Sequence, residues 1–261
     1  MERDTPHWLK PLQSPDVSGG SALHIINVSG LAFHKDEWRE ETAWIKRRLL
    51  HRFPQARVLD FRCPQENCFS SETEPFSSPH NEITRIASTL ANAIDNVSSR
   101  DKNNLSLIFI VHGLGGVLVK QAILLALEVE EYSYIARSMK LMICFDAPHR
   151  SITTTMHPNC KIDLITKMPT HSLIEHLPWQ SYWPVIEEIN IRFSQLGRHC
   201  HLLNFYLCEK GVLTGIDRNA KYMFTTDSVD DTNIQLDKNL GKLGRCDENE
   251  QPITDLIVKF T

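Results

Sequence analysis

The fold of this chain is decided by LSLIFIVHGLGGVLVKQAILLALEVEE, residues 105–131. Leu105–Val111 is apolar throughout, which is typical of a central parallel strand that is buried on both faces. The turn HGLGG at 112–116 follows directly. Residues 117–131 then have the pattern of a helix that is apolar almost all round and is therefore buried. A buried strand, a tight glycine turn and a buried helix predict one unit of an α/β protein.

Similar units stand on both sides of this one. Helical periodicity covers Trp38–Phe53 and Ile83–Val97. Strands separated by helices favour a mostly parallel central sheet with right-handed crossovers and helices on both faces. Further strands are predicted at Leu23–Val28, Ala56–Phe61, Lys140–Ala147, His201–Leu207 and Lys221–Thr226.

A chain of 261 residues suits one domain with a sizeable core. Residues 1–20 are polar and lack the apolar middle of a secretory signal, so they are interpreted as a mobile arm. Residues 21–261 are then a single domain. Within it, 160–198 is a possible cap over a pocket, because Pro169–Trp183 is rich in aromatic residues. An apolar helix of the core explains the same stretch equally well.

Composition limits the classes of partner and the cellular location. A formal net charge of -4 gives no electrostatic case for binding nucleic acid. No apolar run approaches the ~20 residues that a transmembrane helix needs. The odd number of cysteines, seven, favours free thiols in a reducing compartment and hence a cytoplasmic location. Cys63 and Cys68 lie close together, but no second pair has zinc-site spacing, so neither a metal nor another cofactor is predicted.

The turn after the central strand has three interpretations. Ligands of open α/β sheets collect at the carboxyl ends of the strands, and the amides that open a helix favour negative charge. A phosphate loop would need Lys followed by Ser or Thr, whereas Lys120 precedes Gln121. A second interpretation is a glycine turn without chemistry. The third is the nucleophile elbow G-x-S-x-G, with Val111 at the first glycine and Gly113 at the serine position.

The segment FIVHGLGGVLVKQAI at 109–123 resembles the elbow of a fungal family of putative serine esterases. These are lipase-like α/β-hydrolases that occur alone or as N-terminal domains of NACHT- and NLR-type signalling proteins. The resemblance covers roughly residues 20–152 and implies the α/β-hydrolase fold. Three further segments match in the same order: Ser29–Ala32 followed by Trp38, Trp44–Arg57, and Phe145–Ser151.

The departures from the family pattern fall on the catalytic residues. Hydrolysis by a serine needs a hydroxyl at the elbow, a histidine to take its proton and a carboxylate to orient that histidine. Gly113 stands where the family has the serine and supplies no side chain. At the first motif, Ser29 stands where the family has a histidine.

The other two catalytic positions are matched through the more loosely similar segments at 205–209 and 242–252. This match puts Leu240 at the position of the family's histidine, and leucine cannot act as a base. It puts Leu207 at the position of the acid, although Glu209 follows two residues later. The resemblance therefore implies a degenerate triad.

Part of an oxyanion hole is expected to remain, because backbone amides need no particular side chain. The family's donor positions correspond to the amides of Leu31 and Leu114, next to Gly30 and Gly113. These four residues are the predicted ligand pocket.

No catalytic side chain is assigned, but three alternatives stay open. His112 precedes the missing nucleophile and is interpreted mainly as a turn histidine. Asp146 and His149 follow a strand and are candidates for an acid–base pair, with a structural role in the loop as the simpler interpretation. Ser29 is a candidate displaced nucleophile for which no base can be named.

The leading hypothesis is a degenerate hydrolase-like protein that binds a protein partner or a small apolar or acyl-type ligand. The alternative is an enzyme that kept the pocket and changed its reaction, to a cyclisation or isomerisation in specialised metabolism or to weak ester hydrolysis through Ser29. A shaped pocket can orient a substrate without any covalent nucleophile.

Overall fold

The computed structural model describes residues 9–13, 23–28, 49–61, 78–98, 102, 104–145, 147–149, 179–196, 200–208, 226, 231–237 and 258. Its centre is a 7-stranded sheet with the strand order β1-β3-β2-β4-β5-β6-β7. Only β1 runs antiparallel to its neighbour. The strands are β1 (Leu9–Gln13), β2 (Leu23–Val28), β3 (Arg57–Phe61), β4 (Ser106–His112), β5 (Met139–Phe145), β6 (His201–Cys208) and β7 (Thr232–Asp237).

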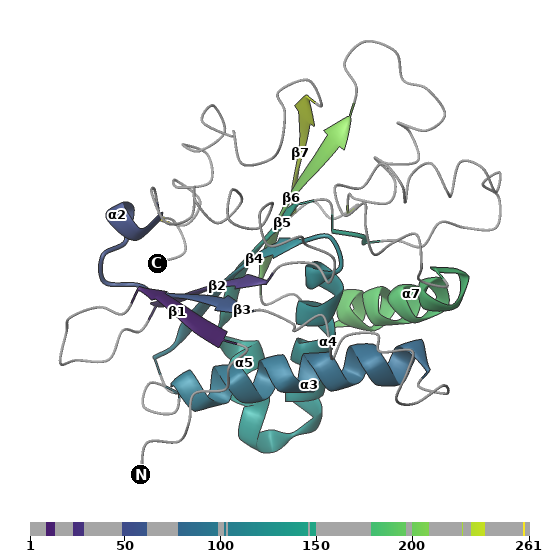
Figure 1. Cartoon of the computed structure of the whole chain (residues 1–261), viewed down its shortest axis with the longest axis horizontal. Coiled ribbons are helices and arrows are strands. Elements are labelled where there is room, and N and C mark those ends of the chain that lie inside the picture. Colours follow the sequence, from purple (N-terminus) through teal and green to yellow (C-terminus); the bar gives the residue numbers. More distant parts are fainter. Residues whose placement is uncertain are drawn as a thin grey trace.

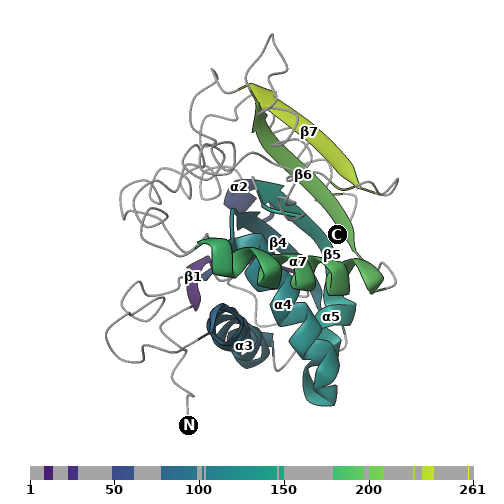
Figure 2. The same cartoon turned by 90° about the vertical axis from the view of Figure 1, so that its right-hand side faces the viewer.

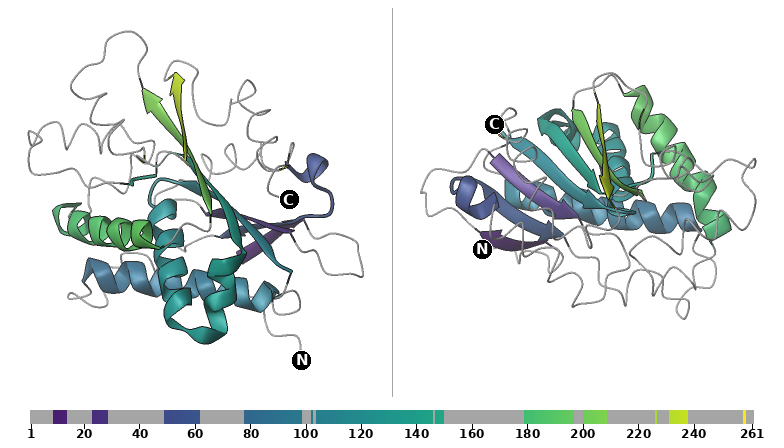
Figure 3. Two further views of the ribbon diagram at one scale, coloured as in Figure 1. Left: turned by 180° about the vertical axis from the view of Figure 1, so that it is seen from behind. Right: turned by 90° about the horizontal axis from the view of Figure 1, so that it is seen from above.

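Most of the described helices lie on one side of this sheet (Figures 1 and 3). They are α3 (Pro79–Ser98), α4 (Gly115–Glu128), the 3₁₀ turn η3 (Glu130–Tyr132), α5 (Ser133–Ser138) and α7 (Trp179–Gln195). The short helix α2 (Leu50–Arg52) lies away from this layer. The sheet is therefore mostly parallel with helices packed against it, as the alternation of strands and helices predicts.

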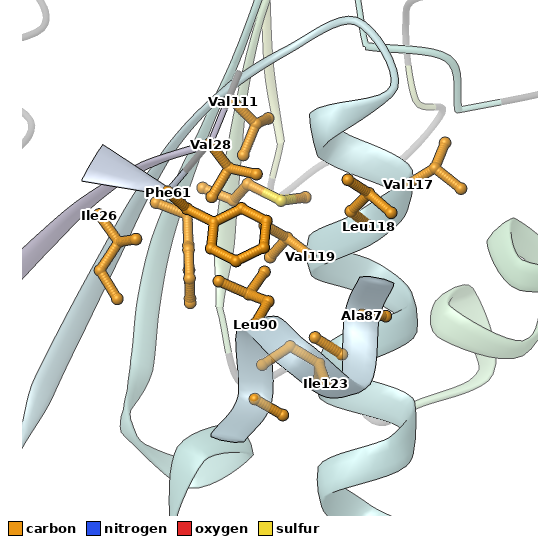
Figure 4. Close-up of a cluster of buried hydrophobic side chains, with 14 of the residues drawn as sticks. Ile26, Val28, Phe61, Ala87, Leu90, Val111, Val117, Leu118, Val119 and Ile123 are labelled. Atoms are coloured by element: carbon orange, nitrogen blue, oxygen red, sulfur yellow. The ribbon is translucent and has the colours of Figure 1, made fainter. Parts of the chain in front are cut away.

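The core explains why β4 and α4 are predominantly apolar. Ile108, Phe109, Ile110 and Val111 are fully buried because β4 lies in the middle of the sheet. Their side chains alternate between two clusters of buried residues, one on each face of the sheet. On the helix-covered face, α3 and α4 pack against each other, and residues of both contribute to the same buried cluster as Phe61 and Val111 (Figure 4).

The predicted strands and helices of the central region are confirmed. β2 has the predicted bounds, and the bounds of α3, β3, β4, β5 and β6 differ from the predictions by a few residues. Of the predicted helix Trp38–Phe53, only the last residues are described, and Leu50–Arg52 is helical. Of the predicted strand Lys221–Thr226, only Thr226 is described, and it is not in a strand. The strand β7 was not predicted, because TNIQLD has no continuous apolar run.

The interpretation of residues 1–20 as a mobile arm is wrong for Leu9–Gln13, which form the edge strand β1. Leu9 is 1% exposed, and the strand pairs with β3 from Leu9↔Phe61 to Gln13↔Val58. Pairing with the open edge of β3 orders a segment that is too polar to be recognised by its own pattern. The other residues of the predicted arm lie outside the described residues.

The described part of the possible cap, 160–198, belongs to the core. Tyr182 and Ile186 of α7 are buried in the cluster that α3 and α4 share. In Figure 2, α7 passes in front of α4 on the helix-covered side of the sheet. Residues 160–178 lie outside the described residues, so a cap there stays a prediction. No helix among the described residues is long and apolar enough to cross a membrane.

Candidate functional site

The sharp turn between β4 and α4 is the candidate site. β4 ends at His112, and the amide of Gly113 still donates to the carbonyl of Phe145 on β5 at 2.9 Å. The chain then turns at Gly113, whose φ is +50°. α4 begins at Gly115, and the amide of Gly116 donates to the carbonyl of Gly113 at 3.2 Å. Strand and helix are thus joined by only two residues.

The backbone at Gly113 has the two properties that a nucleophile elbow needs. Its positive φ lies in the left-handed region, which costs an L-residue free energy. A Cβ built on Gly113 meets no atom of the described residues within 4 Å, so none of those residues would obstruct a side chain here. A nucleophile elbow holds its serine in such a strained, exposed position. This geometry favours the elbow interpretation over a glycine turn that only changes the chain direction.

Gly116 has a packing role instead. A Cβ on this residue would lie 2.7 Å from the Cβ of Ala147 and 3.4 Å from Cγ2 of Val111. Real Cβ atoms do not approach each other as closely as the first distance. A residue without a side chain therefore lets the first turn of α4 pack directly against the ends of β4 and β5.

His112 is part of an aromatic stack across three neighbouring strands. Its ring stacks on Phe145 at 5.0 Å between centroids, and Phe145 stacks on Phe205 at the same distance. The three residues are partners in the strand register. Burial lowers the pKa of His112 from 6.5 to about 4, so its imidazole is neutral near pH 7. These properties favour a structural role over a catalytic one.

A buried lysine lies one turn beyond the glycines. Lys120 of α4 is 2% exposed, and its Nζ donates to Asn190 Oδ1 at 2.6 Å and to the carbonyl of Pro148 at 3.4 Å. Nζ also lies 2.9 Å from His149 Nδ1. Burial lowers the pKa of Lys120 to about 8, against smaller opposite effects of nearby groups such as Cys144. In the sequence, Lys120 is a candidate only for a phosphate loop, and its contacts with His149 and Asn190 are not predicted.

His149 lies within hydrogen-bond distance of Lys120. Its ring is 7% exposed and lies beside the middle of α4. Its predicted partner, Asp146, lies outside the described residues, so the acid–base pair stays a prediction. The same is true of Ser29, Gly30 and Leu31. Leu240 and Glu209 also lie outside them, whereas Leu207 is in β6.

A second buried polar pair was missed by the sequence analysis. Asn27 Nδ2 donates to Asp60 Oδ1 at 2.9 Å, and both side chains are buried. They are register partners near the carboxyl ends of β2 and β3. The signal was present, because each residue is a single polar position near the end of an apolar strand. Among the described residues, no group of three His, Cys, Asp or Glu side chains has the arrangement of a metal site.

No protein-family model matches the sequence, and no curated protein is significantly similar to it. Solved structures do match. A monoacylglycerol lipase from Paleococcus ferrophilus superposes with a TM-score of 0.52 at 10% identity, covering 97% of this chain and 99% of the lipase. The chain has the α/β-hydrolase fold. An arylesterase superposes on this fold with a TM-score of 0.51 at 11% identity, covering 90% of this chain and 74% of that one.

In this α/β-hydrolase fold, the turn 112–116 follows a central strand and opens the helix behind it. The fold's nucleophile elbow is a strand-to-helix turn of this kind. At identities of 10% and 11%, the two superpositions show the fold of this chain but not its activity. Its function has to be argued from the residues at the turn.

Proposed function

We propose that this protein is a catalytically degenerate α/β-hydrolase of the serine-esterase and lipase-like type, which acts by binding rather than by hydrolysis. The observation that carries the proposal is Gly113. The backbone holds this position as an elbow would, with φ +50° and no atom of the described residues within 4 Å of where the nucleophile's Cβ would stand. The residue itself has no hydroxyl to attack an ester.

The backbone of the turn can still bind a polar group. The amide of Leu114 makes no hydrogen bond to any residue that the structure describes, and it lies at the N-terminus of the 14-residue helix α4. Such an amide favours a carbonyl oxygen or an anion. A ligand with an acyl group is therefore the natural small-molecule occupant, with Gly30 and Leu31 as the proposed second side of the pocket.

The engagement of the histidines supports binding over a new acid–base reaction. The alternative enzyme needs His149 to accept a proton from a substrate, but its Nδ1 accepts from the Lys120 ammonium at 2.9 Å, which places the proton of the neutral ring on Nε2. His112 is neutral and stacked between strands. We therefore propose a protein that recognises a partner; the fungal signalling setting is what the resemblance implies, and the cytoplasmic location is what the seven cysteines favour.

The test is labelling with a fluorophosphonate probe, read by intact mass. The wild type, Gly113→Ser and Gly113→Ala are compared; the alanine variant reproduces the backbone strain without a hydroxyl. We expect no adduct on the wild type or on Gly113→Ala. An adduct on Gly113→Ser alone would show that the serine is the missing element, and no adduct on it would show that the base is lost as well. A stoichiometric adduct on the wild type, at Ser29 or elsewhere, would overturn the proposal.

A further inference from the structure

A cavity of about 310 Å³ lies within the helical layer, away from the turn at 112–116. It is lined by residues of α4, α5, α7 and the beginnings of β5 and β6, together with His149, Thr226 and Asp231. None of the residues 112–116 lines it. Most of its wall is apolar, with contributions from Ile123, Leu127, Met139, Phe193, Leu196 and Leu202.

One end of the cavity is polar and carries a buried cation. Lys120, His149 and Asn190 meet there. The hydrogen-bond partners of Lys120 are a carbonyl, an amide oxygen and an imidazole nitrogen, and Phe193 places its ring 5.9 Å from Nζ. Among the described residues, no carboxylate lies within 4 Å of this ammonium. A buried charge without a counterion costs free energy, which a ligand of opposite charge can recover.

The carboxylate that lines the cavity has other partners. Asp231 also lines the cavity, but its oxygens accept from the Thr226 hydroxyl at 2.7 Å and from the Leu202 amide at 3.3 Å. It is close enough to raise the pKa of Lys120 slightly, while burial lowers that pKa to about 8. Asp231 therefore favours the ammonium form of Lys120 without an ion pair to it. Another acceptor can bind Nζ directly.

We propose that this cavity binds a monocarboxylate with an apolar chain, of the medium-chain fatty acid class, with the carboxylate on Lys120 and the chain along the apolar wall. The volume lies at the lower end of the range of small-molecule pockets, about 300–1,000 Å³, so a medium chain fits better than a long one. A cationic ligand would be repelled by Lys120, and a neutral one would leave its charge uncompensated.

The hydrogen bonds around Lys120 allow its Nζ to give up one partner and bind the carboxylate of the ligand instead. The bond from Nζ to the carbonyl of Pro148 is the longest of the three, at 3.4 Å. That carbonyl also accepts from Asn190 Nδ2 at 3.2 Å, so it keeps a donor when Lys120 turns to the ligand. This cavity does not include the elbow. The proposal of a carboxylate site therefore does not depend on whether the protein hydrolyses esters at Gly113.

The first experiment is calorimetric titration of the wild type with sodium decanoate and with decanol, which has the same chain without the charge. Because a charge-assisted hydrogen bond is worth more than a neutral one, we expect decanoate to bind about tenfold more tightly or better. Octanoate is expected to bind more weakly than decanoate, by about fourfold for each missing methylene. Equal affinity for decanoate and decanol, or no binding of decanoate, would overturn the proposal.

Three variants locate the site, each checked for folding by its urea transition. Lys120→Met removes the cation, and Asn190→Asp supplies an internal carboxylate of the same shape; both are expected to abolish the preference for decanoate over decanol. Ser194→Trp fills the cavity from an exposed position on its wall and is expected to weaken both ligands. Lys102→Met, which removes a partly exposed lysine paired with Asp95, is the matched control. A folded Lys120→Met or Ser194→Trp that binds decanoate like the wild type would overturn the proposal.

Discussion

Lys120 Nζ lies 2.6 Å from Asn190 Oδ1, and this hydrogen bond joins α4 to α7 inside the helical layer. The two residues are 70 positions apart in the sequence. Because Asn190 is neutral, it satisfies a donor of the lysine without compensating its charge. The structure thus holds a cation in an apolar layer at a cost in stability, and that cost depends on pH.

The first prediction concerns this pH dependence. Folding lowers the pKa of Lys120 from 10.5 to about 8, so between these values the unfolded chain binds more protons than the folded one. The free energy of unfolding contributed by this group therefore rises with pH, by about 3 kcal/mol from below pH 8 to pH 10.5. We expect the stability of the wild type relative to Lys120→Met to rise between pH 7.5 and 10, as measured by urea unfolding.

The control is Lys102→Met, which removes a lysine from the surface. The difference in the free energy of unfolding between the wild type and Lys102→Met should not rise with pH as the difference for Lys120→Met does. A difference between wild type and Lys120→Met that is the same at pH 7.5 and pH 10 would show that Lys120 has an ordinary pKa.

The second prediction applies the same titration to ligand binding. If decanoate needs the ammonium form of Lys120, its dissociation constant should be flat below pH 8 and rise about tenfold per pH unit above it. The measurement is calorimetric titration from pH 7 to pH 10, with decanol as a control that should stay flat. A decanoate affinity that is constant over this range would argue against an ion pair with Lys120.

Other ionisable groups lie around the same ammonium. His149, Asp231 and Arg137 line the cavity, and the Cys144 and Cys200 thiols influence Lys120. Burial raises the pKa of Cys144 to about 12, so this thiol stays protonated over the range measured. Repeating the calorimetric titration with Cys200→Ser shows whether the Cys200 thiol contributes to the pH dependence of decanoate binding.

The central fold was predictable because local pattern and burial agree there. Strand β4 and most of helix α4 are buried, so their sequences are predominantly apolar and were recognised directly. Strands β1 and β7 were missed for the opposite reason. They lie at the two edges of the sheet, where pairing with a neighbour decides the structure more than the segment's own residues do.

The site was predictable only in part. The spacing around Gly113 placed the turn correctly, since a strand-to-helix turn is a local feature. The contacts of Lys120 with His149 and Asn190 are not local, because they join residues 29 and 70 positions apart. A lysine in a predominantly apolar helix was the sequence signal, and it does not identify the partners.

The third prediction is that His112 makes the fold sensitive to acid. Burial lowers its pKa from 6.5 to about 4, so between these values the unfolded chain binds the proton and the folded chain does not. Stability contributed by this group is therefore lost as the pH falls from about 6.5 to 4, by about 3 kcal/mol in total. We expect His112→Phe, which keeps an aromatic ring on Phe145, to lose less stability than the wild type between pH 7 and pH 5.

Urea unfolding at the two pH values measures this difference, and His51→Gln is the control for losing an exposed imidazole. If His112→Phe and the wild type lost equal stability on acidification, protonation of His112 would not be what destabilises the fold.

The last prediction separates the two glycines of the turn. Gly116→Ala should destabilise the protein by about 1–3 kcal/mol, because its Cβ would lie 2.7 Å from the Cβ of Ala147 and one of the two elements must shift. The double variant Gly116→Ala with Ala147→Gly removes this overlap and should recover most of the lost free energy of unfolding. The Cβ of Gly113→Ala meets no atom of the described residues, so this variant should cost the strain of its positive φ, about 1–2 kcal/mol. Urea unfolding of all four variants, including Ala147→Gly alone, completes the cycle. Strictly additive effects of the Gly116 and Ala147 substitutions would show that the two residues are not in contact, and that another constraint keeps Gly116 at the start of α4.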